Sequence, residues 1–328
     1  MSAGRRALVA PHRRGAGGPR ALERFAVHGY RAGAWLIGHL PVPVARGLIR
    51  FVLVASYALW PSKRRYVNAN FAHVLGREPD DPAVRHQALA AYRTYARYIV
   101  ELMRLPRLTN DVAGGLVDTT NLLPLEAYWR GHRRGLILTT AHIGNLESVA
   151  RGIARHGWPI AALADDTSFP ELFEHLQRQR RAWGVNLIPW RRLRDLYGVL
   201  RRNEVLTLLV DWGYRADGIP VRLFGAWTTL PAGPAALAAK TGAAIVHIAI
   251  RRSDDQRQFV VTYSAPIEVR SSDPAELARA TQAVADELEK TIAAAPEQWY
   301  SFKPLWPITE AERAELAERA AAMLAAGA

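Results

Sequence analysis

The sequence contains no cysteine. Disulfide bonds and cysteine-ligated zinc sites are therefore excluded, and a reducing cytoplasm is compatible with the chain. A Walker A loop, a GxGxxG turn, an HExxH helix and a GxSxG nucleophile elbow are also absent, so nothing indicates nucleotide binding, a zinc protease or a serine hydrolase. Metal-ligand spacing is likewise absent from His132, His156, His175 and His247. We therefore expect no metal and no resident cofactor.

Acidic residues are scarce relative to basic ones. The chain has 43 Lys and Arg against 30 Asp and Glu, giving a net charge of +13. The first sixty residues hold nine arginines and one acid, with Trp and Tyr among them. Such a segment suits a membrane headgroup layer or single-stranded nucleic acid. Because no nucleic-acid-binding signature is present, membrane lipids are the expected partner and nucleic acid is not.

A long uninterrupted apolar run is missing near the N-terminus, and so is a signal-peptide cleavage pattern. Residues 1–20 are rich in Arg, Gly and Pro, and we expect a disordered basic tail. Two amphipathic helices are expected within residues 21–62, over Leu22–Leu40 and Val44–Trp60. Arginines interrupt the second, which favours helices lying in the membrane interface over a spanning helix. The alternative is that both helices only pack on the catalytic domain.

The remaining chain alternates apolar strands with helices. A hydrophobic fraction of 49% supports a sizeable core. A long helix is expected over Ala83–Leu105, followed by alternating strands and helices from residue 136 to about 294. This order predicts an α/β fold with a mostly parallel or mixed central sheet flanked by helices. We expect one domain over residues 63–308 and a C-terminal helix over 309–328.

The stretch GLILTTAHIGNLE, Gly135–Glu147, joins a buried strand to a polar turn and the start of a helix. Chemistry is commonly placed at the carboxyl ends of strands in such sheets. His142 and Glu147 would be rotated by about 140° on one unbroken helix, so they can meet only if His142 lies in the loop. Gly144 would permit the bend, and Asn145 would cap the helix.

His142, four intervening residues and Glu147 match the HxxxxD/E motif of the glycerolipid acyltransferase superfamily. The surrounding AHIGNLE resembles the branch containing lipid A late acyltransferases and phosphatidylinositol mannoside acyltransferases. Further similar segments follow in the expected order: YVNANFAHVLG at 66–76, WTTLPAGPAA at 227–236 and PEQWYSFKPLW at 296–306. The resemblance covers Lys63–Trp306 and implies a glycerol-3-phosphate acyltransferase-like fold.

This resemblance implies roles for particular residues. His142 would be the general base and Glu147 the carboxylate that orients it. Asp211 follows a buried strand and would either support catalysis or only cap a turn. An arginine just before Gly184 would contact an anionic group of the substrate. The implied substrate-binding residues are Asn145, Arg180, Arg181, Phe224, Gly225, Gly233 and Lys303.

The resemblance also implies an activity. The enzyme would transfer a fatty acyl group from acyl-CoA or acyl-ACP to a hydroxyl of an anionic glycolipid, at the cytoplasmic face of the inner membrane. The segment PAGPA and the single Lys303, where lipid A enzymes tend to carry an Arg pair, favour a phosphatidylinositol mannoside as acceptor. The alternatives are a lipid A precursor as acceptor, a thioester hydrolase, and a non-catalytic membrane-binding protein with this fold.

Overall fold

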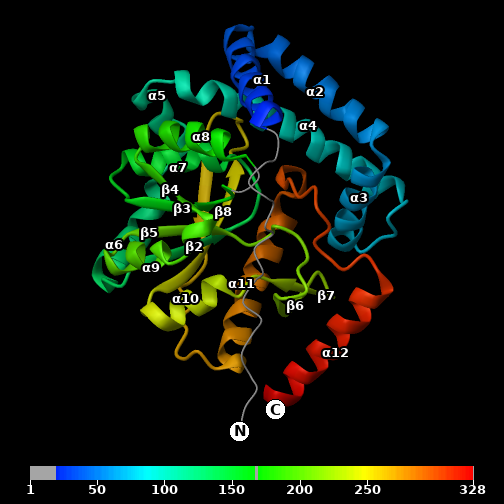
Figure 1. The fold of residues 1–328 in the computed structure, drawn as a ribbon, viewed down its shortest axis with the longest axis vertical. Coiled ribbons are helices and arrows are strands. Elements are labelled where there is room, and N and C mark those ends of the chain that lie inside the picture. The colour runs from blue at the N-terminus through cyan, green and yellow to red at the C-terminus, as the bar shows by residue number, and fades with distance from the viewer. Residues whose placement is uncertain (1–19, 167–168, 328) are drawn as a thin grey trace.

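The computed structural model describes residues 20–166 and 169–327, so the expected disordered tail lies, except for Arg20, outside the described residues. A seven-stranded sheet forms the centre of the molecule, with helices on both sides (Figure 1). Its spatial order is β1-β9-β8-β2-β5-β3-β4. The strands are β1 (Val117–Asp118), β2 (Leu136–Thr140), β3 (Ile160–Ala164), β4 (Val185–Pro189), β5 (Val205–Leu209), β8 (Ala244–Arg252) and β9 (Phe259–Tyr263).

The sheet is mixed. Strands β8, β2, β5, β3 and β4 run parallel to one another, whereas β9 pairs antiparallel with β8 and parallel with β1. In β2 the side chains alternate between two layers: Ile137 packs in one core cluster, and Leu136 and Leu138 pack in the other. The predicted α/β class with a mixed sheet and flanking helices is confirmed.

The helices divide between these two layers. Buried residues of α3 (Pro61–Leu75), α4 (Pro82–Arg104), α9 (Asp195–Arg201), α10 (Gly233–Thr241) and α11 (Pro274–Ala294) share the core cluster of Ile137. The opposite layer contains α6 (Leu123–His132) and α7 (Leu146–Arg155). The other helices are α1 (Arg20–His39), α2 (Val42–Leu59), α5 (Asn110–Gly115), α8 (Pro170–Ala182) and α12 (Glu310–Gly327).

Helices α1 and α2 lie over α4 on the side away from the sheet (Figure 1). Ile37 of α1, Ala45 of α2 and Val100 of α4 form a small buried cluster. The guanidinium of Arg104 donates to the carbonyls of Ile37 and Leu40, which fixes the turn between α1 and α2 on α4. Both helices therefore pack on the α/β domain.

One face of α2 remains exposed and apolar. By length and composition alone, α2 could cross a membrane, but its side facing α4 carries Ala45 and Tyr57 into the protein core. We call the exposed set the apolar stripe of α1 and α2: Trp35, Leu36, Val44, Leu48, Phe51, Val52, Leu59 and Trp60. Within α2 these apolar residues recur at helical spacing on one side.

The segment from Pro296 to Leu305 returns from α11 to the carboxyl ends of the strands. Asn70 of α3 anchors it: the buried side-chain amide donates to the carbonyls of Ser301 and Lys303 and accepts from the backbone N–H of Leu305. Three backbone groups would lose a partner without this amide, so Asn70 fixes the position of Lys303.

A two-stranded hairpin, β6 (Ile219–Leu223) and β7 (Ala226–Leu230), was not predicted in full. The sequence predicts a strand over Val221–Phe224, and most of the second strand falls within WTTLPAGPAA, which is identified only as a segment resembling the family. Phe224 and Gly225 form the two-residue turn, and both have positive φ, as the hairpin twist requires. The backbone N–H of Phe224 donates to the carboxylate of Glu289 on α11, which holds the turn.

Candidate active site

His142 lies in the loop that joins β2 to α7, as predicted from its spacing. Asn145 is the N-cap of α7, and its side chain accepts a hydrogen bond from the backbone N–H of Ser148 at 3.0 Å. Gly144 has φ +63°, and a Cβ atom there would lie 2.6 Å from the carbonyl oxygen of Ile250. The loop therefore needs glycine at this position, both for its backbone angle and for its close approach to β8.

The carboxylate that contacts His142 belongs to Asp211, which follows the neighbouring strand β5. Asp211 Oδ1 lies 2.8 Å from His142 Nδ1, and Oδ2 accepts the backbone N–H of His142 at 2.9 Å. Parallel pairing of β2 with β5 brings these two strand ends together. The carboxylate thus fixes both the ring and the backbone of His142.

Trp299 completes the environment of this carboxylate. Its indole N–H donates to Asp211 Oδ2 at 2.8 Å, and its ring is almost fully buried against Phe71. The backbone N–H of Tyr300 donates to the carbonyl of His142 at 2.7 Å, so the same segment also holds the loop. Trp299 was missed as a site residue from the sequence, although it stands within the PEQW segment.

The electrostatic environment favours an ionised Asp211 beside His142. Burial alone would raise the pKa of Asp211, but His142 and the hydrogen bonds from His142 and Trp299 lower it below its ordinary value. Burial lowers the pKa of His142, Asp211 raises it more, and Lys303 opposes that rise; the net pKa is raised. Since ionised Asp211 accepts from Nδ1–H, the neutral ring presents an unprotonated Nε2.

A cavity of about 220 Å³ opens beside His142, and we call it the histidine cavity. Its wall is mostly apolar and aromatic: Tyr95, Tyr98, Ile143, Gly144, Leu146, Asp211, Trp212, Tyr300, Ser301, Phe302 and Lys303 join His142 there. The ring of Trp212 lies 5.6 Å from that of His142, and the ammonium of Lys303 lies 3.7 Å from the centre of the Trp212 ring. Lys303 therefore lies in the wall of the cavity, supported by a cation–π contact.

Glu147 does not contact His142. Its carboxylate faces Arg180 of α8, with Oε2 3.0 Å from Nε and Oε1 2.5 Å from Nη2. The structure therefore corrects the predicted pairing: Asp211, not Glu147, orients the histidine. Glu147 lies on the first turn of α7, and its side chain faces Arg180 of α8 and not the loop that holds His142.

Arg180 is the buried member of its arginine group. Its side chain is 9% exposed, whereas Arg178 and Arg181 are exposed at the surface. Burial opposes its charge, but Glu147 offsets this and raises the pKa of Arg180. Arg180 holds Glu147, and the structure gives Arg181 no contact with the histidine cavity.

The remaining predicted binding residues lie apart from His142. Asn145 is buried and donates to Glu101 at 3.1 Å. Phe224 and Gly225 form the hairpin turn, and Gly233 begins α10. None of these four lines the histidine cavity. No cluster of His, Asp or Glu suited to a metal ion occurs among residues 20–166 and 169–327.

A histidine–carboxylate pair at the ends of two parallel strands, facing an aromatic cavity, is an arrangement that can act as a general base in an α/β protein. Residues 19–307 match the family model described as bacterial lipid A biosynthesis acyltransferase, so the chain belongs to that family. It is 27% identical over 300 residues to the phosphatidylinositol mannoside acyltransferase of Mycolicibacterium smegmatis, covering 88% of this chain and 94% of that protein.

A second relative shows the same pattern. The phosphatidylinositol mannoside acyltransferase of Mycobacterium tuberculosis (strain H37Rv) is 28% identical over 302 residues, covering 88% of this chain and 92% of that protein. The protein is therefore an acyltransferase that acts on glycolipids, which confirms the predicted family and class of enzyme.

The opposing influences of Asp211 and Lys303 on His142 predict two opposite pH shifts. His142 accepts a proton only when neutral, so activity falls as pH drops through its pKa. Replacing Asp211 by Asn removes the contact that raises this pKa, and should move the acid limb of kcat/KM to lower pH while reducing kcat by about 100-fold or more. Lys303→Met removes a cation and should move the limb to higher pH. The same acid-limb pKa of kcat/KM in the unmodified protein and in both variants would contradict this electrostatic account.

The buried Glu147–Arg180 pair predicts an asymmetry in stability. Glu147→Leu leaves a buried guanidinium without its carboxylate and should lower the free energy of unfolding by about 3–5 kcal/mol. The double variant Glu147→Leu/Arg180→Met should recover most of that loss, because both charges are removed together. Urea unfolding followed by circular dichroism measures both. A double variant as unstable as the single one would show that the pair is not the cause.

Proposed function

We propose that the protein transfers a fatty acyl group from a thioester donor, acyl-CoA or acyl-ACP, to a hydroxyl of a phosphatidylinositol mannoside. The observation that carries the mechanism is the His142–Asp211 pair facing the histidine cavity. His142 Nε2 takes the proton of the acceptor hydroxyl, and the alkoxide oxygen attacks the thioester carbonyl carbon. The tetrahedral intermediate then collapses, the C–S bond breaks, and the leaving thiolate takes the proton from His142. The ester and a free thiol are the products.

Direct transfer is favoured over an acyl-enzyme because no hydroxyl in contact with His142 is available as nucleophile among the described residues. Ser148 is buried in α7. Ser301 lines the cavity, but its Oγ donates to the carbonyl of Lys303 and contacts the Asn70 amide. Lys303 is the cationic side chain of this wall and is available to stabilise the oxyanion or an anionic headgroup.

The mannoside acceptor is supported by relatives named phosphatidylinositol mannoside acyltransferase, which this chain matches over most of their length. It is also supported by charge. Lys303 is the one Lys or Arg among the residues lining the histidine cavity. A mannose ring joined to one phosphodiester needs fewer cationic contacts than a lipid A precursor. Each missing charge-assisted contact weakens binding by about 1.5–3 kcal/mol.

The acceptor is tested with purified enzyme, offered a phosphatidylinositol mannoside or a lipid A precursor together with labelled acyl-CoA or acyl-ACP. We expect label in the mannoside and no label with a His142→Gln variant that remains folded. If only the lipid A precursor were labelled, the proposed acceptor would be wrong, but the proposed acyl transfer would still hold. Free labelled fatty acid would identify a hydrolase, and no product with any donor would favour a binding protein.

We further propose that the apolar stripe and the arginine-rich N-terminal region hold the enzyme on the cytoplasmic face of the membrane, without crossing it. Helix α2 packs along α4 through Ala45 and Tyr57, so it lies against the domain on one side and can offer only its other side to lipid. Phe51 and Leu59 are 73% and 81% exposed on that side. Burial of such side chains stabilises the bound state by about 1.5–3 kcal/mol each.

Replacing Phe51 and Leu59 together by Glu should lower the fraction that pellets with phosphatidylinositol-containing vesicles by at least about tenfold. The matched control is Leu324→Glu, an exposed leucine on α12 that is 59% exposed and lies outside the stripe. Equal pelleting of the stripe variant, the control and the unmodified protein would place the membrane contact elsewhere.

A further inference from the structure

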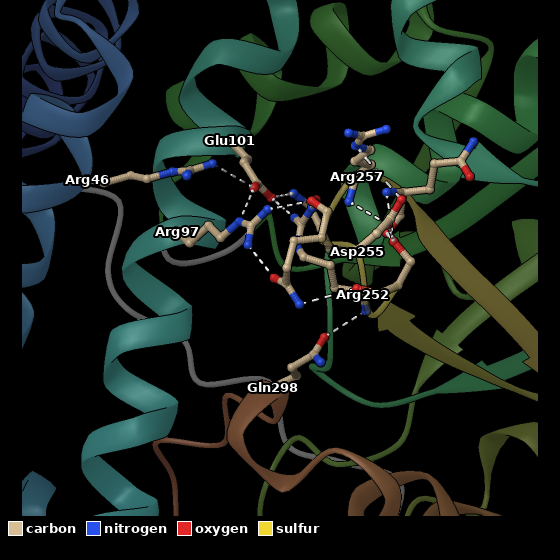
Figure 2. Close-up of polar contacts among 11 residues, drawn as sticks. Arg46, Arg97, Glu101, Arg252, Asp255, Arg257 and Gln298 are labelled. Carbon is tan, nitrogen blue, oxygen red and sulfur yellow. Dashed lines mark hydrogen bonds and ion pairs between the residues drawn. The ribbon is translucent and has the colours of Figure 1, made fainter.

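Three arginines from different elements converge on one carboxylate, Glu101 of α4 (Figure 2). Arg97, one turn earlier, lies 2.8 Å from Glu101 Oε1, and Arg252 at the end of β8 lies 2.5 Å from Oε2. Arg46 of α2 approaches at 3.8 Å, which is longer than a direct hydrogen bond. Its guanidinium is therefore held near the cluster without being fully engaged by Glu101.

A second cavity of about 220 Å³ lies at this cluster, and we call it the guanidinium cavity. Arg97, Glu101 and Arg252 line it, together with Asn145. Its wall also contains Tyr98, Gly144 and Tyr300, which line the histidine cavity as well. The two cavities are therefore neighbours on either side of the loop that carries His142. A ligand could bind in both at once.

The wall of the guanidinium cavity carries two arginines, Arg97 and Arg252, and two carboxylates, so the excess positive charge at this cluster comes from Arg46, which approaches Glu101 from outside the wall. Glu101 is shared among three arginines, and Glu297 is the other carboxylate of the wall. Burial lowers the pKa of Arg252; Glu101 opposes this, but nearby Arg97 and Arg46 add to the lowering. Arg251 and Arg257 pair with Asp254 and Asp255 in the adjacent turn, so their charges are locally balanced.

The cavity also offers N–H donors of the kind that bind an oxyanion. Arg97 and Arg252 project planar guanidinium groups from different elements, and their other N–H groups reach Gln256 in the turn after β8. Guanidinium groups bind phosphate oxygens in pairs of parallel hydrogen bonds. A volume of about 220 Å³ is below the roughly 300–1,000 Å³ of a whole-ligand pocket, which fits one fragment of a larger headgroup.

We propose that the guanidinium cavity binds the phosphodiester of the lipid acceptor while the sugar hydroxyl reaches His142 in the histidine cavity. This inference rests on the proposed function. The position of Arg46 favours a lipid phosphate over a phosphate of the acyl donor. Arg46 belongs to α2, whose opposite side carries the exposed stripe, so the cluster lies beside the element that faces lipid. Phosphodiesters of membrane lipids occupy that same interfacial layer.

Glu101 has a definite part in this site. In the absence of ligand it offsets repulsion among the three guanidinium groups and holds them in place. A bound phosphate competes with it for the same N–H donors. Neutralising Glu101 should therefore strengthen anion binding, whereas neutralising an arginine should weaken it. A purely structural ion-pair cluster predicts no such opposite response.

The test is calorimetric titration of the full chain with glycerophosphoinositol, the water-soluble headgroup diester, and separately with coenzyme A. Arg46→Gln and Arg252→Gln should each weaken glycerophosphoinositol binding by about tenfold, and Glu101→Gln should tighten it. Arg46 is 44% exposed, so its variant tests the site even if Arg252→Gln fails to fold. Affinity for coenzyme A should stay unchanged throughout.

The matched control is Arg85→Gln, which removes an exposed arginine sixteen residues before Glu101 on α4, about 24 Å away along the helix. It should bind like the unmodified protein. Unchanged binding in the cluster variants, or no binding by the unmodified protein at millimolar concentrations, would overturn the proposal. Weakening confined to coenzyme A would assign the cavity to the donor and also overturn it. Because no acyl transfer is measured, these outcomes are independent of whether the proposed reaction occurs.

Discussion

The buried carboxylate of Asp211 is the constraint on which the active site depends. Its side chain is fully inaccessible, and a buried charge is costly unless it is paired and hydrogen-bonded. Three donors meet this requirement: the ring and the backbone of His142, and the indole of Trp299. One charge therefore joins the ends of β2 and β5 to the segment after α11. Any displacement of that segment would leave the carboxylate short of a donor and the histidine without its orientation.

The two acidic residues near His142 have separate partners, because they come from different elements: Asp211 follows β5, and Glu147 lies on α7. Asp211 approaches from the next strand and sets the tautomer of the base. Glu147 turns away on α7 and neutralises Arg180, which ties α7 to α8. The two ends of the motif therefore have different partners: His142 in the loop contacts Asp211, and Glu147 attaches α7 to α8 through Arg180. A nearby carboxylate in sequence is not necessarily the nearest in space.

The sequence predicted what depends on local pattern. Periodic apolar residues identified the long helix and the parallel strands, and the turn signals at Gly144 and Asn145 identified the loop and its cap. It did not predict the pairing of His142 with Asp211, because that contact spans 69 residues and depends on strand order. Trp299 was missed for the same reason. The hairpin was only half predicted because an aromatic residue, Phe224, occupies a turn position with positive φ where Gly or Asn is more usual.

The N-terminal helices are part of the catalytic structure and not only an attachment to it. Arg46 of α2 approaches Glu101 of α4, and Glu101 accepts a hydrogen bond from Asn145, the cap of α7. Asn145 stands three residues after His142, so a short series of polar contacts runs from α2 to the loop that holds His142. Gly144 allows no freedom in that loop, since any side chain there would meet β8. Glu101 therefore lies between α2 and the cap of α7, and it connects the two regions through its contacts with Arg46 and Asn145.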